Sequence, residues 1–331
     1  MLYDDGFLGR LEARLREALP RWGLAPDAPL KLLTISENAT FLAERPDGEP
    51  VVFRVHRPDY HSLDEIRSEL AWLEALRADG VALTPEPLPL TDGEALGALD
   101  DDGALRHVAA FSFVAGREPE PGDNLVGWYR ILGRVTAKLH AHARAWRRPD
   151  GFRRKTWDYD ATIGDGAHWG DWRDGLGLDA AGRAVLERTT AQLKSDVAAY
   201  GVTPETFGLI HCDLRPANLL VDDDRLAVID FDDCGFGWFM YDFAAAVSFM
   251  EHEPFIPELE AAWLDGYGAV APVKPEDAAM LPTFRMLRRM QLTAWVASHA
   301  ETPTAQAMGE PFTHGTVMLA ERYLANGSGR P

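Results

Sequence analysis

The sequence predicts an α+β fold with two lobes, a small sheet-rich lobe followed by a larger, mainly helical one. Residues 30–55 hold three short apolar runs, LKLLTI, TFLAE and VVFRV, separated by turn-forming residues as in antiparallel strands. After Gly116, apolar residues recur at helical spacing instead. The chain has 331 residues and is 46% hydrophobic, which is enough for two lobes with a core each. We expect an N-lobe over residues 1–114 and a C-lobe over residues 115–331.

The N-lobe is predicted to hold a five-stranded antiparallel sheet and one helix, after a leading amphipathic helix. Ser62 can cap the helix after the third strand, with Glu65 as the partner in a capping box. The expected elements in chain order are a helix over residues 6–19, three strands within residues 30–55, a helix over residues 62–76, and strands over residues 94–99 and 105–114.

The C-lobe is predicted to be helical apart from one hairpin, whose two strands flank an acidic turn. Residues 150–180 are rich in Trp, Gly and Asp and have no clear periodicity, so we assign no element to them. The expected elements are helices over residues 125–145 and 182–200, strands over residues 218–221 and 226–231, and further helices to about residue 325.

The composition argues against several kinds of partner. Lys and Arg number 33 against 52 Asp and Glu, a net charge of −19 at pH 7. Duplex nucleic acid and anionic membranes attract clustered Lys and Arg, so we expect neither as a partner. The chain has no long uncharged apolar run and no signal-peptide pattern, so we expect a cytoplasmic protein. Cys212 and Cys234 have no CxxC partner, which argues against a disulfide framework or a zinc site.

The segment LIHCDLRPANLLVDDDRLAVIDFDD contains H-x-D-L-x-x-x-N, with His211, Asp213 and Asn218, and Asp230 follows at the end of an apolar run. Phosphoryl transfer from ATP needs a group that orients the acceptor hydroxyl and oxygen ligands for Mg²⁺ on the phosphates. Asp213 can accept the hydroxyl proton, while Asn218 and Asp230 offer hard oxygen donors. The spacing therefore predicts Asp213 as the catalytic residue and Asn218 and Asp230 as metal ligands. The alternative is an acidic surface loop.

At these residues the chain resembles the aminoglycoside phosphotransferase superfamily, which includes choline kinases, type II homoserine kinases and stress-response kinase A. IDFDDCGFGWFMYDFA is most similar to the stress-response kinase branch, as are SENATFLAE, FRVHRPDYHS and SELAWLEALR. The resemblance covers about residues 30–300. It implies a bilobal protein-kinase-like fold, ATP and Mg²⁺ as cofactors, Asp213 as the base, and Asn218 and Asp230 as the Mg²⁺ ligands.

The resemblance also implies phosphate contacts in the N-lobe, although no G-x-G-x-x-G is present. Ser36 and Asn38 of the SENA turn would offer donors to the phosphates, unless SENA is an ordinary hairpin turn. Arg54 stands at the strand position of the usual kinase lysine, and Glu69 would be its partner on the helix. The forked guanidinium can contact both phosphate and carboxylate. A solvated arginine on an edge strand is the alternative for Arg54.

The connector FSFVAG is implied to be the hinge between the lobes. Backbone groups of Ser112, Phe113 and Val114 would pair with adenine. Because such contacts use no side chain, the residue types neither support nor oppose them.

Several polar residues near the motif have both a structural and a functional interpretation. We expect His211 to contact backbone rather than act in catalysis, and Asp242 to hydrogen-bond the catalytic loop from the next helix. Cys212 has no basic partner in the sequence that would favour a thiolate, so packing is its expected role. Asp232 and Asp233 would either approach a second Mg²⁺ or the acceptor, or form an exposed acidic turn.

Two groups of residues are candidates for the acceptor side of the site. Arg285, Arg288 and Arg289 share one late helix, where they could hold an anionic substrate or form salt bridges on the helix surface. The aromatic residues that could line an acceptor pocket or pack in a core are Trp157, Tyr159, Trp169 and Trp172.

The acceptor divides the functional hypotheses. One is a hydroxyl of a small molecule, such as an amino alcohol, a sugar or an amino acid, and another is Ser or Thr of a protein. No A-P-E segment follows Asp230, and the next helix is expected by Tyr241, so an extended peptide would have little platform. This favours a small molecule. A third hypothesis is a pseudokinase scaffold, motivated by Arg54, and an antibiotic-resistance phosphotransferase is disfavoured.

Overall fold

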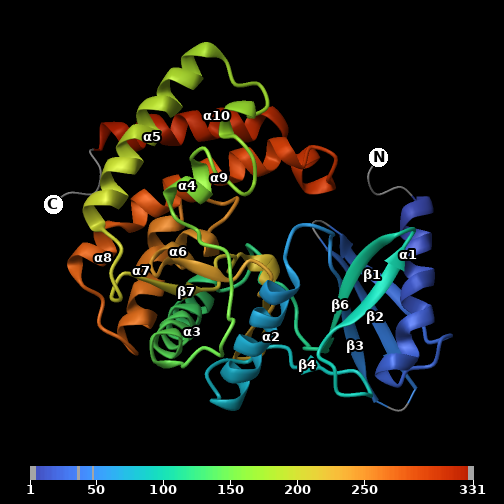
Figure 1. Cartoon of the computed structure of the whole chain (residues 1–331). Coiled ribbons are helices and arrows are strands. Elements are labelled where there is room, and N and C mark those ends of the chain that lie inside the picture. The colour runs from blue at the N-terminus through green and yellow to red at the C-terminus, as the bar shows by residue number, and fades with distance from the viewer. Residues whose placement is uncertain (1–4, 36–37, 47, 327–331) are drawn as a thin grey trace. The chain divides into compact units, whose positions relative to one another are not determined.

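The computed structural model describes residues 5–35, 38–46 and 48–326 (Figure 1). The chain divides into two compact units, Met1–Gly116 with Arg147–Arg154 and Arg117–Trp146 with Lys155–Pro331. The first unit holds an antiparallel sheet and the second is mainly helical, so the predicted α+β fold class is confirmed. The lobe boundary at residue 114 stays a prediction.

The sheet of the first unit has six described strands in the order β1-β2-β3-β6-β4, with β5 also paired to β6. Every pairing is antiparallel. The sequence predicted five strands and missed β4, which is only two residues long and begins at Pro87. Proline has no backbone N–H, so a proline-rich segment does not resemble a strand. The strands are β1 (Leu30–Ile35), β2 (Ala39–Arg45), β3 (Gly48–Val55), β4 (Pro87–Leu88), β5 (Gly97–Asp101) and β6 (Ala104–Ser112).

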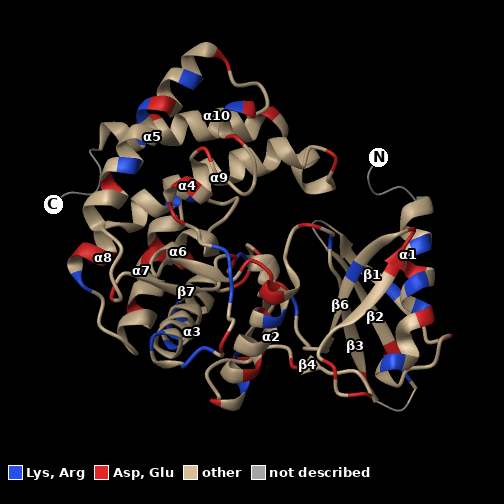
Figure 2. Ribbon diagram, in the orientation of Figure 1, with Lys and Arg blue, Asp and Glu red and all other residues tan. Residues whose placement is uncertain are grey.

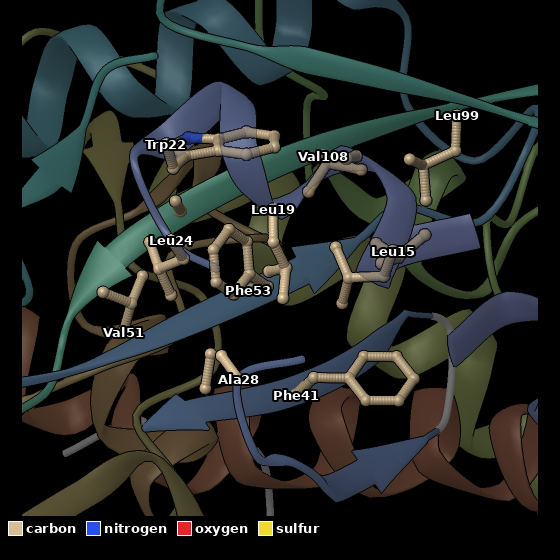
Figure 3. Packing of buried hydrophobic residues seen from close by; sticks show 14 of the residues in the cluster. Leu15, Leu19, Trp22, Leu24, Ala28, Phe41, Val51, Phe53, Leu99 and Val108 are labelled. Carbon is tan, nitrogen blue, oxygen red and sulfur yellow. The ribbon is translucent and has the colours of Figure 1, made fainter. Parts of the chain in front are cut away.

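One face of this sheet is covered by α1 (Asp5–Ala18) and the short helix η1 (Leu19–Trp22). Apolar side chains of these helices and of the strands form a hydrophobic core between them (Figure 3). Side chains alternate along a strand, so Phe53 of β3 points to this face with its neighbours two residues away. The Trp22 and Phe53 rings meet edge to face with centroids 5.2 Å apart. Leucines of α1 and η1 fill the space around Phe53, as the amphipathic pattern predicted.

The next residue of β3, Arg54, therefore points to the opposite face, where α2 (Leu63–Ala78) contributes its contact. α2 begins as predicted, because the Ser62 hydroxyl accepts from the Glu65 N–H while the Glu65 side chain accepts from the Ser62 N–H. This capping box satisfies two backbone donors at the start of the helix. A properly started α2 brings Glu69, which is fully buried, to the arginine.

The second unit consists of helices around two small β-pairs. The hairpin β8–β9 follows the predicted strands, whereas the pair β7–β10 was not predicted. β7 and β10 are far apart in the chain, so no local turn pattern indicates their pairing. The elements are α3 (Leu125–Ala145), α4 (Tyr159–Ile163), η2 (Trp172–Asp174), α5 (Ala180–Tyr200), β7 (Phe207–Ile210), η3 (Pro216–Asn218), β8 (Leu219–Asp222), β9 (Arg225–Val228), β10 (Gly235–Trp238), α6 (Tyr241–Ala246), α7 (Ile256–Gly268), α8 (Pro275–Ala279), α9 (Leu281–Ser298) and α10 (Pro303–Ala325).

Charged residues of both signs lie along the outer helices, as α5 in Figure 2 illustrates. In the part of the chain that the structure describes, no helix combines the length and the apolar character needed to cross a bilayer.

Two glycines allow α3 and α7 to pack closely. A Cβ atom on Gly133 of α3 would collide with the Trp263 carbonyl oxygen, and one on Gly266 of α7 would collide with the Arg130 carbonyl oxygen. The two helix backbones therefore touch at these positions. The contact also brings Tyr267 of α7 next to α3, and this pair of helices supports the catalytic loop described below.

Replacing Gly266 with alanine should destabilise the protein by about 3 kcal/mol, because the methyl group has to push two backbones apart. The urea midpoint of unfolding measures this. Gly268→Ala is the matched control, since it lies at the end of the same helix with no atom within 4 Å of its added methyl group. The control should be neutral or stabilising by up to about 1 kcal/mol. Equal midpoints for both variants would contradict the close helix contact.

Candidate active site

The loop between β7 and β8 carries the predicted motif, and it begins directly after Ile210. Cys212 in this loop and Asp230 just beyond β9 have positive φ angles of 70° and 61°. Such angles are uncommon for residues other than glycine and cost of order 1–3 kcal/mol each. Neighbouring contacts must therefore hold both turns in place, and the structure shows them.

The Asp213 carboxylate has a partner on each oxygen. Oδ1 accepts from Arg288 Nη2 at 2.6 Å, and Oδ2 accepts from Asn218 Nδ2 at 2.7 Å and Arg215 Nε at 3.2 Å. The side chain keeps 12% of its surface exposed. The carboxylate is thus fixed in orientation and still reachable, as a base that receives a proton from a bound hydroxyl must be.

Asn218 is positioned by the same carboxylate. Its Nδ2 donates to the Asp213 main-chain oxygen at 2.8 Å and to Asp213 Oδ2 at 2.7 Å. An amide side chain has one donor group and one acceptor oxygen. Since the nitrogen is used by Asp213, the carbonyl oxygen Oδ1 is the atom of Asn218 that can bind a cation.

Asp230 is an exposed carboxylate at the end of the hairpin. Burial opposes the charge of Arg215, yet Asp213 and Asp230 outweigh it and raise the pKa of the guanidinium, so both carboxylates act on one side chain. Within the described ranges, no cluster of three His, Cys, Asp or Glu residues could hold a metal alone. The oxygens of Asn218 and Asp230 fit Mg²⁺, which takes one or two protein ligands and completes its shell with phosphates and water.

Asp242, the second residue of α6, holds the start of the loop, as predicted. Its Oδ1 accepts from the Cys212 N–H at 2.7 Å and its Oδ2 from the His211 N–H at 3.2 Å. His140 Nε2 of α3 lies 2.9 Å from Oδ2, and His140 Nδ1 lies 3.0 Å from the Tyr267 hydroxyl. Burial lowers the pKa of His140 although Asp242 opposes this, so a neutral ring that donates from Nε2 fits the contacts.

His211 contacts main chain at both ring nitrogens, which confirms the structural role predicted for it. Nε2 donates to the Ile229 carbonyl oxygen at 3.2 Å, and Nδ1 accepts from the Asp213 N–H at 3.2 Å. Burial lowers the pKa of His211 in spite of the nearby carboxylates. The neutral imidazole therefore links the catalytic loop to the residue just before Asp230.

Two neighbours of the site residues are buried. Cys212 is 1% exposed, and burial raises the pKa of its thiol, so the packing role is confirmed. Asp232 is also buried, so the exposed acidic turn is the wrong interpretation for it. Asp233 is half-buried, and its carbonyl oxygen accepts from Trp157 Nε1 at 2.9 Å.

The sequence analysis named Arg288 as a candidate for the acceptor side and missed its contact with Asp213. Arg288 shares one helix face with three buried residues, Phe284, Gln291 and Trp295. An arginine in such a face needs a buried anion. That anion is Asp213. The pattern thus indicates burial of Arg288, although it does not name the partner.

The other two arginines of this helix have separate carboxylate partners. Arg289 Nη1 donates to Glu251 at 2.9 Å, and Arg285 Nη1 donates to Glu260 at 2.9 Å. Arg289 is buried like Arg288, so a salt bridge on the helix surface is the wrong interpretation for these two residues. It holds for Arg285, whose side chain is partly exposed.

The aromatic group of residues 150–180 is largely buried, which agrees with core packing. Trp157 and Trp169 meet edge to face at 5.4 Å, and Trp172 is 1% exposed. Trp169 also reaches the site, because the Arg288 guanidinium lies over its ring at 4.9 Å from the centroid.

In the first unit, the predicted pairing of Arg54 with Glu69 is present. Arg54 Nη1 donates to Glu69 Oε1 at 2.6 Å, and the guanidinium lies over the Phe111 ring at 5.0 Å from its centroid. β3 is an inner strand of the sheet and Arg54 is 7% exposed, so the solvated edge-strand alternative is wrong. Removing one partner of a buried ion pair costs about 3–5 kcal/mol, so each residue requires the other.

The remaining N-lobe residues are placed only in part. Ser36 lies outside the described residues, whereas Asn38 Oδ1 accepts from the Arg57 N–H at 3.0 Å. The Ser112 N–H donates to the Glu86 carbonyl oxygen at 2.8 Å, and the Ser112 hydroxyl accepts from the Glu86 N–H at 2.8 Å. These contacts tie Ser112 to its own sheet, while Phe113, directly after β6, is 39% exposed.

Known proteins resemble this chain over most of its length. The solved structure of a microcompartment-associated aminopropanol kinase is 42% identical, with a TM-score of 0.89, and the match covers 96% of this chain and 98% of that one. Amicoumacin kinase of Bacillus subtilis (strain 168) is 23% identical over 84% of this chain and 82% of its own length. Stress response kinase A of Salmonella typhi is 26% identical over 85% of this chain and 81% of its own length.

These relatives are all kinases, and they confirm the resemblance inferred from the motifs. The model of the phosphotransferase enzyme family matches residues 32–274, a range that includes the Asp213 loop and the Arg54 strand. The protein is an ATP-dependent phosphotransferase that acts on a hydroxyl group. With most of its length inside that match, the chain belongs to the phosphotransferase enzyme family.

Proposed function

We propose that the protein transfers the γ-phosphoryl group of ATP to the hydroxyl of a small amino alcohol. The observation that carries this proposal is the 42% identity to an aminopropanol kinase, which extends over 96% of the chain. A match at this level over nearly the whole chain supports a shared class of acceptor as well as a shared donor. A free hydroxyl on a small molecule also suits a base with limited exposure, like Asp213.

Asp213 would orient the acceptor hydroxyl and receive its proton. The hydroxyl oxygen then forms a bond to the γ-phosphorus, and the bond from that phosphorus to the β–γ bridging oxygen breaks, so that ADP leaves. A carboxylate whose two oxygens are already fixed needs little reorganisation when the hydroxyl binds. The fixed geometry at Asp213 supports this role.

Asn218 Oδ1 and Asp230 would hold the Mg²⁺ that accompanies ATP. When bound, the metal neutralises charge on the phosphates. Asn218 also links this metal site to the base, because its nitrogen donates to Asp213 while its oxygen remains for the cation.

In the first unit, Arg54 would contact the ATP phosphates while its ion pair with Glu69 holds it in place, and Asn38 and Ser36 would add phosphate contacts. Phe113 and Val114 would pair with adenine through their backbone. Ser112 belongs to this predicted hinge as well, although its own N–H is already bonded to Glu86.

A protein Ser/Thr acceptor is the second candidate, favoured by the 26% identity to stress response kinase A. The short path after Asp230 argues against it. β10 begins at Gly235 and α6 at Tyr241, so the described chain offers no long segment there to support a peptide. A pseudokinase is disfavoured, because the three motif residues are present and Arg54 has its glutamate.

Asp213→Asn should lower kcat by roughly 10²- to 10⁴-fold, since the amide cannot take the hydroxyl proton. The amide oxygen can still accept from Arg288 although the charge of the pair is lost, so we expect a folded variant of lower thermal stability. Its ATP affinity, measured by calorimetry, should stay within a few-fold. Asp196→Asn is the matched control, a buried carboxylate that accepts from Tyr323 and Gln192. It should retain kcat. A fully active Asp213→Asn enzyme would remove the assignment of the base.

Asp230→Ala should abolish the Mg²⁺ dependence of ATP binding, which calorimetry with and without Mg²⁺ measures. Because even indirect partners of a metal contribute roughly 10- to 100-fold, we expect at least about tenfold weaker binding with the metal present. Asp224→Ala is the control, an exposed carboxylate on the turn of the same hairpin. Mg²⁺-dependent binding of wild-type strength in Asp230→Ala would exclude this ligand.

A panel of acceptors tests the amino alcohol directly. ADP release should be fastest with aminopropanol and related amino alcohols, and at least about tenfold slower with propanol, which keeps the hydroxyl and lacks the amine. That factor corresponds to one lost hydrogen bond to a charged group. Faster phosphorylation of a generic Ser/Thr protein substrate, or equal rates with and without the amine, would reject the proposed acceptor class.

A further inference from the structure

We propose that Arg288 of α9 is a positioning residue for phosphoryl transfer, acting by holding the Asp213 carboxylate in its working orientation. This inference rests on the proposed role of Asp213 as the base. All of the residues that carry it belong to the second unit.

The guanidinium of Arg288 is fixed by a separate contact at each nitrogen. Nη2 donates to Asp213 Oδ1 at 2.6 Å, Nε donates to Ser248 Oγ at 2.9 Å, and Nη1 donates to Gln291 Oε1 at 3.1 Å. Its side chain is 1% exposed, and the Trp169 ring lies against its face. A planar fork held at three points cannot rotate, so it determines where Asp213 Oδ1 lies.

Two of the partners of Arg288, Gln291 and Ser248, are linked to α6, the helix that holds the loop. Tyr241, the first residue of α6, donates its hydroxyl to Gln291 Oε1, and Ser248 follows α6 and donates to the Ala245 carbonyl oxygen. Asp242, which follows Tyr241 in α6, accepts two hydrogen bonds from the loop backbone. α6 therefore positions the two backbone residues before Asp213 through Asp242, and it supports the Asp213 carboxylate through Arg288.

The other contacts of Asp213 cannot replace this one. Asn218 shares its amide between the main chain and the carboxylate of Asp213 and is also the proposed metal ligand. The Arg215 side chain is 33% exposed, and its Nε lies 3.2 Å from Oδ2, farther than Arg288 lies from Oδ1. Water therefore competes with Arg215 for the carboxylate. Arg288 is the buried cation among the described contacts of Asp213. The charge persists, because Tyr241 and Asp213 outweigh the effect of burial and raise the pKa of Arg288.

A purely structural role does not account for this arrangement. A buried ion pair often contributes little net stability compared with apolar side chains of similar volume. The adjacent Arg289 is equally buried and already ties α9 to Glu251 and, through Phe312 and Thr316, to α10. Of these two arginines, only Arg288 pairs with the Asp213 carboxylate. Arg289 thus has a structural role, whereas Arg288 positions Asp213.

Arg288→Lys tests the proposal, because lysine keeps the charge and cannot meet three contacts at once. We expect kcat to fall on the order of 10- to 100-fold, as for a misplacement of about 1 Å, with the ATP Kd unchanged within about twofold. Arg289→Lys is the matched control and should keep kcat within about threefold while losing a similar amount of thermal stability. A kcat for Arg288→Lys within about threefold of wild type, or an equal loss in Arg289→Lys, would overturn the inference.

A double-mutant cycle separates action through Asp213 from any other effect. In the Asp213→Asn background, Arg288→Lys should leave the residual rate unchanged, since residues that act as a unit are not additive. A further loss of the same size as in the wild-type background would overturn the inference. If Asp213→Asn alone keeps full kcat, the proposed base fails; if it is inactive while Arg288→Lys is active, only the inference about Arg288 fails.

Ser248→Ala supplies the same test should Arg288→Lys not fold. It removes the contact to Nε and leaves the ion pair in place. We expect kcat several-fold below wild type with unchanged ATP affinity, because the fork can then rotate. Wild-type kcat in Ser248→Ala combined with an unfolded Arg288→Lys would count against the positioning role.

Discussion

The catalytic loop depends on the hydrogen bonds that the carboxylate of Asp242 accepts from its backbone. The carboxylate accepts two consecutive backbone N–H groups, from His211 and Cys212, at the point where Cys212 has a positive φ angle. That conformation is unfavourable for cysteine, and the two hydrogen bonds stabilise it. Asp242 is itself held by the neutral ring of His140 on α3. The loop geometry thus follows from a buried network rather than from regular secondary structure.

Helix packing delivers the members of that network. α3 carries His140 and α7 carries Tyr267, and the two helices approach closely only because Gly133 and Gly266 have no side chains at their contact. A larger residue at either glycine would separate the hydroxyl of Tyr267 from His140. The position of Asp213, the proposed base, therefore depends on two glycines at the contact of α3 with α7.

Three buried carboxylates each have a buried arginine as partner. Asp213 has Arg288, Glu251 has Arg289, and in the first unit Glu69 has Arg54. An unpaired buried charge is far more costly than a paired one, so each pair fixes both of its members in place. The pairs at Asp213 and Arg54 involve residues with proposed roles in transfer. Each of these two ion pairs therefore neutralises a buried charge and also holds a residue with a proposed role in a fixed orientation.

A protein acceptor and a small one place different demands on the region after Asp230. In this chain β10 follows almost at once and pairs with β7, which leads into the catalytic loop. The segment that could present a peptide is thereby used to hold the loop. This arrangement agrees with the proposed small-molecule acceptor and with the 42% sequence identity to an aminopropanol kinase.

The sequence by itself determined the fold class, the hairpin β8–β9 and the motif from His211 to Asp230, because periodicity and fixed spacing act over short distances in the chain. The Arg54–Glu69 pair followed only from the resemblance to a known family, and the structure contains it. The sequence did not reveal the two-residue strand β4, the pairing of β7 with β10, or the partner of Arg288. Each of these joins segments far apart in the sequence, and Arg288 lies 75 residues from Asp213. Which buried cation meets which carboxylate is decided by how helices pack, so only the tertiary structure assigns Arg288 to the base.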